Sequence, residues 1–165
     1  AAKARIFVAP TFGIQITTLP EASDWGITTE VAESLGMRRE LEIGAESMKE
    51  LHRRGVKVLP GGDYGFAWNP IGTNARDLEH FVNYLNFTPM EAIVAATKFG
   101  GQIMMMGDEL GLIKESYLAD LLIVDGAAVQ DVRIVQDSSR LLGIMKDGNF
   151  HKRPSDQLAV QRQAA

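Results

Sequence analysis

The pattern of apolar and polar residues predicts two short buried strands that flank a helical region. Residues 5–10 form a run of aliphatic and aromatic side chains that ends at a proline, and residues 56–59 form a second apolar run. Between them, residues 27–54 repeat apolar side chains at helical spacing among Glu, Arg and Lys. Gly36 and Gly44 are expected to divide this helical region into two or three pieces.

Helix-end signals are the clearest local features. Basic residues 52–54 followed by Gly55 are typical of a helix C-terminus with a left-handed cap. A further helix is predicted over residues 75–85. Residues 88–91 (Thr-Pro-Met-Glu) combine an N-cap, a proline at the first helical position and a capping box, so they begin another helix that should run to about Phe99.

The last third of the chain is predicted to be rich in short strands. An Asp-Gly pair at residues 147–148 is a hairpin signal, so the two runs that flank it should pair with each other. The expected strands cover residues 110–113, 120–124, 141–146 and 149–152. The order of elements therefore predicts an α/β layer followed by a small antiparallel piece.

Composition and charge exclude several function classes. Apolar residues make up 45% of the 165 positions, and charged residues make up 23%, as in an ordinary globular chain. A net charge of -4 gives no positive surface for nucleic acid or an anionic membrane. There is no cysteine, which excludes disulfides, thiolate metal sites and cysteine nucleophiles. The sequence predicts no partnership with nucleic acid or membrane, and the cytoplasm is the default compartment.

Four sequence motifs follow one another between residues 56 and 152. The first closes a predicted strand, the second opens a helix, the third is the capped helix, and the fourth leads into the C-terminal strands. They are Gly61-Gly62-Asp63, Asn74-Ala75-Arg76-Asp77-Leu78-Glu79, Thr88-Pro89-Met90-Glu91-Ala92-Ile93 with Ala95-Ala96-Thr97, and Leu110-Gly111-Leu112-Ile113 with Ala119-Asp120-Leu121-Leu122-Ile123-Val124-Asp125-Gly126. This series resembles the C-terminal part of the amidohydrolase superfamily, particularly the branch of imidazolonepropionase-like enzymes and metal-dependent dipeptidases.

The resemblance implies a fold. Residues 5–10 and 56–59 would be the seventh and eighth strands of a (β/α)8 TIM barrel, so residues 1–106 would hold the last two βα units. Residues 107–153 would be the C-terminal strands of a small accessory β-domain, and residues 154–165 would be a frayed tail.

The resemblance also implies an activity centred on Asp63. A metal-dependent amidohydrolase hydrolyses an amide or related carbon–nitrogen bond of a small molecule with metal-activated water. Asp63 would bind the metal and carry the proton from water to the leaving group. The expected cofactor is a divalent metal, Zn²⁺ by default, as one ion or two. Taken without the resemblance, Gly-Gly-Asp also fits a turn whose carboxylate bonds its own loop.

The other ligands of the metal are expected to come from outside this chain. His52, His80 and His151 are widely spaced and form no His-x-His pair, and we expect structural roles for His52 and His80. In the family, the other ligands come from earlier barrel strands. The resemblance therefore implies that an N-terminal portion of the same enzyme, as a separate or cleaved chain, completes the site. The sequence leaves open whether the enzyme forms a higher oligomer.

Four residues after Asp63 are candidates for the substrate pocket: Tyr64, Phe66, Trp68 and Asn69. They share one loop at the end of the second strand, where barrel enzymes place their chemistry. Alternatively, the aromatic residues form a plug under that loop.

Other positions near the proposed site are less specific. Gly62 stands where the family usually has threonine, and Tyr64 stands where it has a small residue. Residues 11–13 are expected in a loop, and residues 19–29, which include a tryptophan, are either a lid or a surface connection. Arg76 could contact a substrate or form a salt link.

Two other functions fit the same residues. One is a non-catalytic α/β binding or assembly module derived from such an enzyme. The other keeps the metal barrel but opens lactones, hydrolyses esters or phosphotriesters, or catalyses eliminations or isomerisations.

Overall fold

The computed structural model describes residues 6–154, which form a mixed α/β structure. The predictions for residues 1–5 and for the tail at 155–165 lie outside the described residues. The two strands predicted first, β1 (Phe7–Val8) and β2 (Lys57–Val58), pair in parallel with Phe7 opposite Lys57. This pairing confirms the predicted strands, although each is shorter than its apolar run.

A helix that the sequence pattern did not predict follows β1. Residues 11–13 were expected in a loop, but α1 (Phe12–Glu21) begins there and is followed by the short 3-10 helix η1 (Ser23–Trp25). Two threonines of α1 donate to carbonyls one turn earlier, Thr17 to Gly13 at 2.9 Å and Thr18 to Ile14 at 2.6 Å. Its β-branched residues and a proline at position 20 are poor helix formers, so tertiary contacts must support this helix.

The helical region predicted over residues 27–54 consists of two helices. Helix α2 (Thr29–Ser34) and helix α3 (Met37–Arg53) are separated at Gly36, which has a φ of 82°. The expected break at Gly44 was wrong, because Gly44 lies inside α3, where a Cβ would be 2.9 Å from the Phe12 ring. This glycine therefore serves helix packing rather than helix termination. Gly55 has the predicted left-handed φ, at 78°.

Helix α4 (Arg76–Leu85) lies where it was predicted. The capping box at Thr88 and Glu91 is confirmed, and it begins α5 (Pro89–Val94). The helix then continues as the π-helical turn η2 (Ala95–Phe99) and as α6 (Gly100–Ile103), so it extends past the predicted end at Phe99.

Replacement of Thr88 by alanine is expected to lower the free energy of unfolding by about 1 kcal/mol, because the N-cap oxygen that accepts from the Glu91 amide is removed. Urea unfolding measures the change. Thr97→Ala is the matched control in the same helix, since its hydroxyl only donates to the Ile93 carbonyl. Equal losses in both variants would contradict a specific capping role.

The C-terminal residues form an antiparallel sheet in the order β3 (Leu121–Val124), β4 (Leu141–Lys146) and β5 (Asn149–Lys152). The hairpin turn predicted at Asp147 and Gly148 is confirmed, with φ values of 49° and 74°. The strand expected at 110–113 was wrong, because this segment is irregular and Gly111 packs with a φ of 91° against the helix backbone at Thr97.

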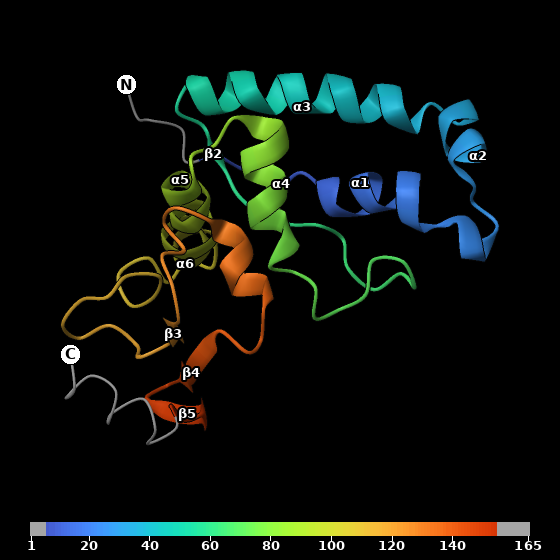
Figure 1. Ribbon diagram of the computed structural model, residues 1–165. Coiled ribbons are helices and arrows are strands. Elements are labelled where there is room, and N and C mark those ends of the chain that lie inside the picture. The colour runs from blue at the N-terminus through green and yellow to red at the C-terminus, as the bar shows by residue number, and fades with distance from the viewer. Residues whose placement is uncertain (1–5, 155–165) are drawn as a thin grey trace.

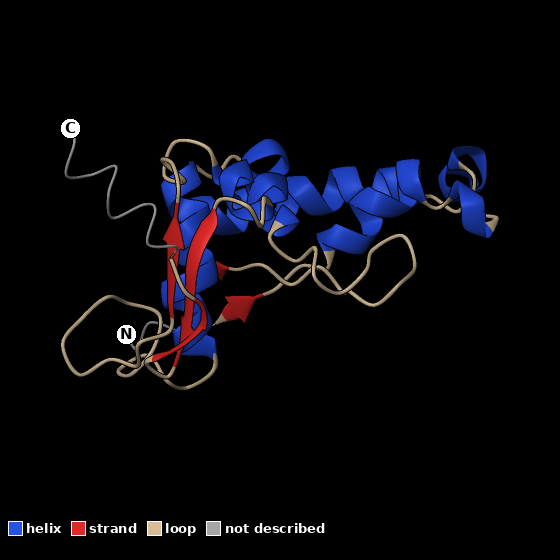
Figure 2. Ribbon diagram, turned by 60° about the horizontal axis from the view of Figure 1, so that its bottom comes forward, coloured by secondary structure: helices blue, strands red, loops and turns tan. Residues whose placement is uncertain are grey.

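The helices pack around α4. Helices α1 and α3 run side by side and both contact α4, while η3 (Val132–Gln136) brings the C-terminal segment against α4 and α5 (Figure 1). The β3–β5 strands lie at one side of the helical layer (Figure 2). No helix within residues 6–154 combines the length and apolar composition that crossing a membrane requires.

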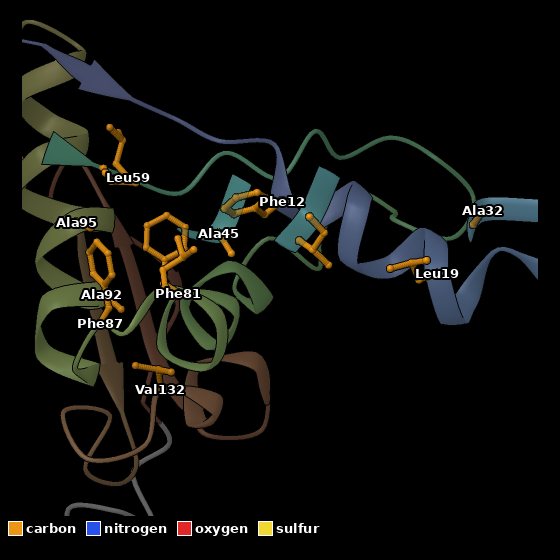
Figure 3. Packing of buried hydrophobic residues seen from close by; sticks show 13 residues of the cluster. Phe12, Leu19, Ala32, Ala45, Leu59, Phe81, Phe87, Ala92, Ala95 and Val132 are labelled. Atoms are coloured by element: carbon orange, nitrogen blue, oxygen red, sulfur yellow. The ribbon is translucent and has the colours of Figure 1, made fainter. Parts of the chain in front are cut away.

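The hydrophobic core lies where these helices meet. Phe81 of α4 is only 1% exposed, and its ring meets Phe87 edge to face with 5.0 Å between centroids (Figure 3). Val132 extends this core to the C-terminal segment. The core therefore fixes α4, whose first turn contacts the loop after β2 through Asp77.

Candidate functional site

Asp63 lies on the loop that follows β2, at the carboxyl end of the parallel pair. It is exposed and has a φ of 54°, an uncommon conformation for a residue other than glycine. Its loop lines a cavity of about 790 Å³ together with the first turn of α4 and the end of the α5–α6 helix. The carboxyl ends of parallel strands are where α/β folds place their ligands, so this position fits a functional carboxylate.

Gly62 is surrounded so closely that no side chain fits there. A Cβ at position 62 would lie 2.5 Å from Tyr64 Cε2 and 2.7 Å from Asp77 Oδ1. Gly13 of α1 also lies close to Gly62, since a Cβ on Gly13 would be 2.8 Å from Gly62 Cα. The Tyr64 ring therefore occupies the space that a threonine at position 62 would need.

The substitution Gly62→Ala is expected to cost about 1–3 kcal/mol of stability through overpacking against Tyr64 and Asp77. Because the two sites touch, the double variant Gly62→Ala/Tyr64→Ala should lose less than the sum of the single losses. Thermal or urea unfolding of the four proteins measures this coupling. Gly100→Ala is the control, since a Cβ there would meet nothing outside its own helix within 4 Å; additive losses would contradict the steric account.

Tyr64 is held by a buried carboxylate. Its hydroxyl donates to Asp77 Oδ1 at 2.8 Å, and Asp77 is only 4% exposed. Burial raises the pKa of the Tyr64 hydroxyl, and the bond to Asp77 raises it further, so this phenol stays protonated at neutral pH. His80 Nδ1 lies 3.6 Å from the same Asp77 oxygen. Asp77 was not among the site residues predicted from the sequence, although it is the acidic residue of the Asn-Ala-Arg-Asp segment.

Arg76 ties α4 to α1 rather than reaching into the cavity. Its guanidinium donates two hydrogen bonds to Glu21, one of them at 3.1 Å. These bonds lower the pKa of the Glu21 carboxyl. The salt link, one of the two alternatives for Arg76, is the arrangement observed.

The other predicted pocket residues lie on the same loop as Asp63. Asn69 is fully buried and donates to the backbone carbonyls of Gly62 and Asp63. Trp68 donates to Thr18 Oγ1 at 2.9 Å, and its ring lies between those of Phe66 and Trp25, at 5.5 and 5.8 Å.

The cavity around Asp63 is lined by Tyr64 but not by Phe66, Trp68 or Asn69. A role for these three in the substrate pocket stays a prediction. The same holds for residues 19–29 as a lid, because Trp25 contacts Trp68 but is half exposed.

The described residues offer one suitable metal ligand rather than a complete set. Within residues 6–154, no group of three or more His, Cys, Asp or Glu side chains is arranged so that it could hold a metal ion. His52 stacks on Phe87 with 3.8 Å between centroids, and His80 faces Asp77, so both have packing roles. The exposed Asp63 carboxylate is the type of oxygen donor that divalent cations accept, and it fits as one ligand among several.

The sequence profile of the amidohydrolase family matches residues 8–151. The chain belongs to the amidohydrolase family. Ochratoxinase from Aspergillus niger is 28% identical over 107 residues, which are 62% of this chain and 21% of the relative. The chain thus spans about a fifth of the length of this curated relative.

Solved structures agree with this assignment to the amidohydrolase family. A candidate prolidase from Bifidobacterium longum is 26% identical with a TM-score of 0.75, over 96% of this chain and 39% of that structure. The crystal structure of Aspergillus niger ochratoxinase shares the fold with a TM-score of 0.73 at 22% identity, over 91% of this chain and 33% of that one. Together with the family match over residues 8–151, these structures confirm the predicted resemblance to the amidohydrolase superfamily.

Proposed function

We propose that this chain is the C-terminal part of a metal-dependent amidohydrolase that hydrolyses an amide or a related carbon–nitrogen bond. In this proposal β1 and β2 are the last two strands of a (β/α)8 barrel, and β3–β5 end an accessory β-domain. The observation that carries the proposal is the position of Asp63, an exposed carboxylate at the carboxyl end of β2, in the lining of a cavity of about 790 Å³.

Asp63 has two roles in the proposed reaction. Its carboxylate would be one of the ligands of a divalent cation, Zn²⁺ by default, whose chemistry when bound is to make water a nucleophile near neutral pH. Asp63 would accept the proton of the attacking water and return it to the leaving nitrogen, as base and then as acid. Tyr64 and Asp77, which are joined by a hydrogen bond, line the cavity beside it.

The other ligands would come from an N-terminal portion of the same enzyme. Both outer edges of the β1–β2 pair are without a strand partner among residues 6–154. Three large apolar side chains that line the cavity around Asp63 are exposed: Ile71 at 81%, Met104 at 60% and Ile103 at 43%. Exposed apolar side chains gathered around one cavity are typical of an interface, which supports a larger assembly around the cavity.

The names of the similar proteins suggest which substrates to test. The similar proteins include a candidate prolidase and ochratoxinase, so a dipeptide with a C-terminal proline and ochratoxin both belong in a substrate panel. We include an N-acyl amino acid as a simple amide, and a lactone and a phosphotriester to test the other reactions of metal barrels.

The test is hydrolysis by the chain prepared with its N-terminal portion, after metal removal and after reloading with Zn²⁺. We expect cleavage of at least one amide in the panel, loss of activity on chelation and recovery on reloading. Native mass spectrometry on the same sample should show a second chain or segment and metal. A metal-free homo-oligomer of the chain without amidase activity would overturn the proposal and favour a binding module.

A further inference from the structure

A buried asparagine holds the turn that carries Asp63. Asn69 is 0% exposed, although its side chain is polar. Its amide nitrogen Nδ2 donates to the Gly62 carbonyl at 3.0 Å and to the Asp63 carbonyl at 3.1 Å. A buried amide that donates both of its N–H groups to one turn is a strong local constraint, because replacing this side chain would remove two hydrogen bonds from the same turn.

The turn needs such a constraint. Asp63 has a φ of 54°, in the left-handed region that aspartate tolerates but does not prefer. The Gly62 carbonyl also accepts from the Ile14 amide of α1 at 2.9 Å. The peptide groups on each side of the Asp63 Cα are therefore held by donors from α1 and from Asn69, and these bonds fix the direction in which the Asp63 Cα–Cβ bond leaves the backbone.

Asn69 is itself fixed by a small hairpin. The Gly65 amide donates to the Asn69 carbonyl at 2.9 Å, and the Asn69 amide donates to the Phe66 carbonyl at 3.0 Å. Its side chain does not line the cavity that contains Asp63. Asn69 thus acts on Asp63 through the backbone and would not touch a substrate there.

We propose that Asn69 is the positioning residue for Asp63: its amide donates to both carbonyls of the turn and so sets the direction in which the catalytic carboxylate points. This inference rests on the proposed function. It assigns to Asn69 a role different from the wall of the substrate pocket, which would alter substrate affinity first.

The test compares Asn69→Asp and Asn69→Ser in the complete, metal-loaded hydrolase. Aspartate keeps the shape but cannot donate to either carbonyl when ionised, and serine is too short to reach both. We expect kcat to fall about 10–100-fold in both variants, with KM changed less than about threefold. Metal affinity should fall, and amide hydrogen exchange over residues 61–65 should become faster.

Thr88→Ala is the control for general destabilisation, because its cap lies at the start of α5 and outside the lining of the cavity. It should leave kcat, metal affinity and exchange over residues 61–65 unchanged. If Asn69→Asp does not fold, the folded Asn69→Ser variant decides the question.

Three outcomes separate the proposals. A raised KM with wild-type kcat in the Asn69 variants would overturn the positioning role and place Asn69 in substrate binding. Wild-type kcat and exchange in these variants, with an inactive Asp63→Asn enzyme, would overturn only the Asn69 inference. Full activity of Asp63→Asn would overturn the proposed function on which the inference rests.

Discussion

Replacement of Asp63 by asparagine is expected to lower kcat by about 10²–10⁴-fold, the usual contribution of a positioned acid–base group. Asparagine keeps the side-chain shape and tolerates the left-handed φ of 54° at this position, so the fold should persist. The amide cannot accept the proton of the attacking water, and it is a poorer ligand for a divalent cation. Steady-state hydrolysis of the best amide in the panel, with metal content measured in the same sample, checks this result.

Asp147→Asn is the matched control for that experiment. Asp147 is also exposed and also has a positive φ, of 49°, but it lies in the turn between β4 and β5. Activity should be unchanged in this variant. If both variants kept wild-type kcat, Asp63 would have no catalytic part.

The second large effect is expected at Phe81, where alanine should lower the free energy of unfolding by about 3–5 kcal/mol. The Phe81 side chain is 1% exposed and joins α4 to Phe87, so its removal leaves a cavity in the middle of the core. Urea unfolding of the complete protein measures the change. Asn83→Ala on the exposed face of the same helix should change it by less than about 0.5 kcal/mol.

A loss at Phe81 below about 1 kcal/mol would mean that the helices around α4 do not share one core. The position of the Asp63 loop against α4 would then lack the support that the structure gives it.

Elements with a complete local signal were predictable from the sequence. Thr88 and Glu91 form a capping box whatever lies around them, and the Asp147–Gly148 turn needs only two residues with positive φ. Helix α1 carried no such signal, because its stability comes from distant partners: Phe12 packs against Gly44, and Glu21 binds Arg76. The segment at 110–113 looked like a strand, but Gly111 instead fits against a helix backbone.

The candidate site likewise has features that the sequence could predict and features that it could not. The position of Asp63 after a strand could be predicted, since strand ends are marked locally by Pro60 and two glycines. The fit of Tyr64 into the space left at Gly62 could not, because it depends on Asp77 of α4. The role of Asn69 was likewise hidden, since nothing in its sequence context shows which carbonyls its amide reaches.

Anomalous diffraction at the zinc edge, on zinc-loaded crystals of the complete enzyme, shows whether Asp63 is a metal ligand. We expect an anomalous peak at the carboxyl end of β2, with an Asp63 carboxylate oxygen about 2.0–2.2 Å from it. A metal bound elsewhere, with the Asp63 carboxylate outside its coordination sphere, would show that Asp63 does not bind the metal.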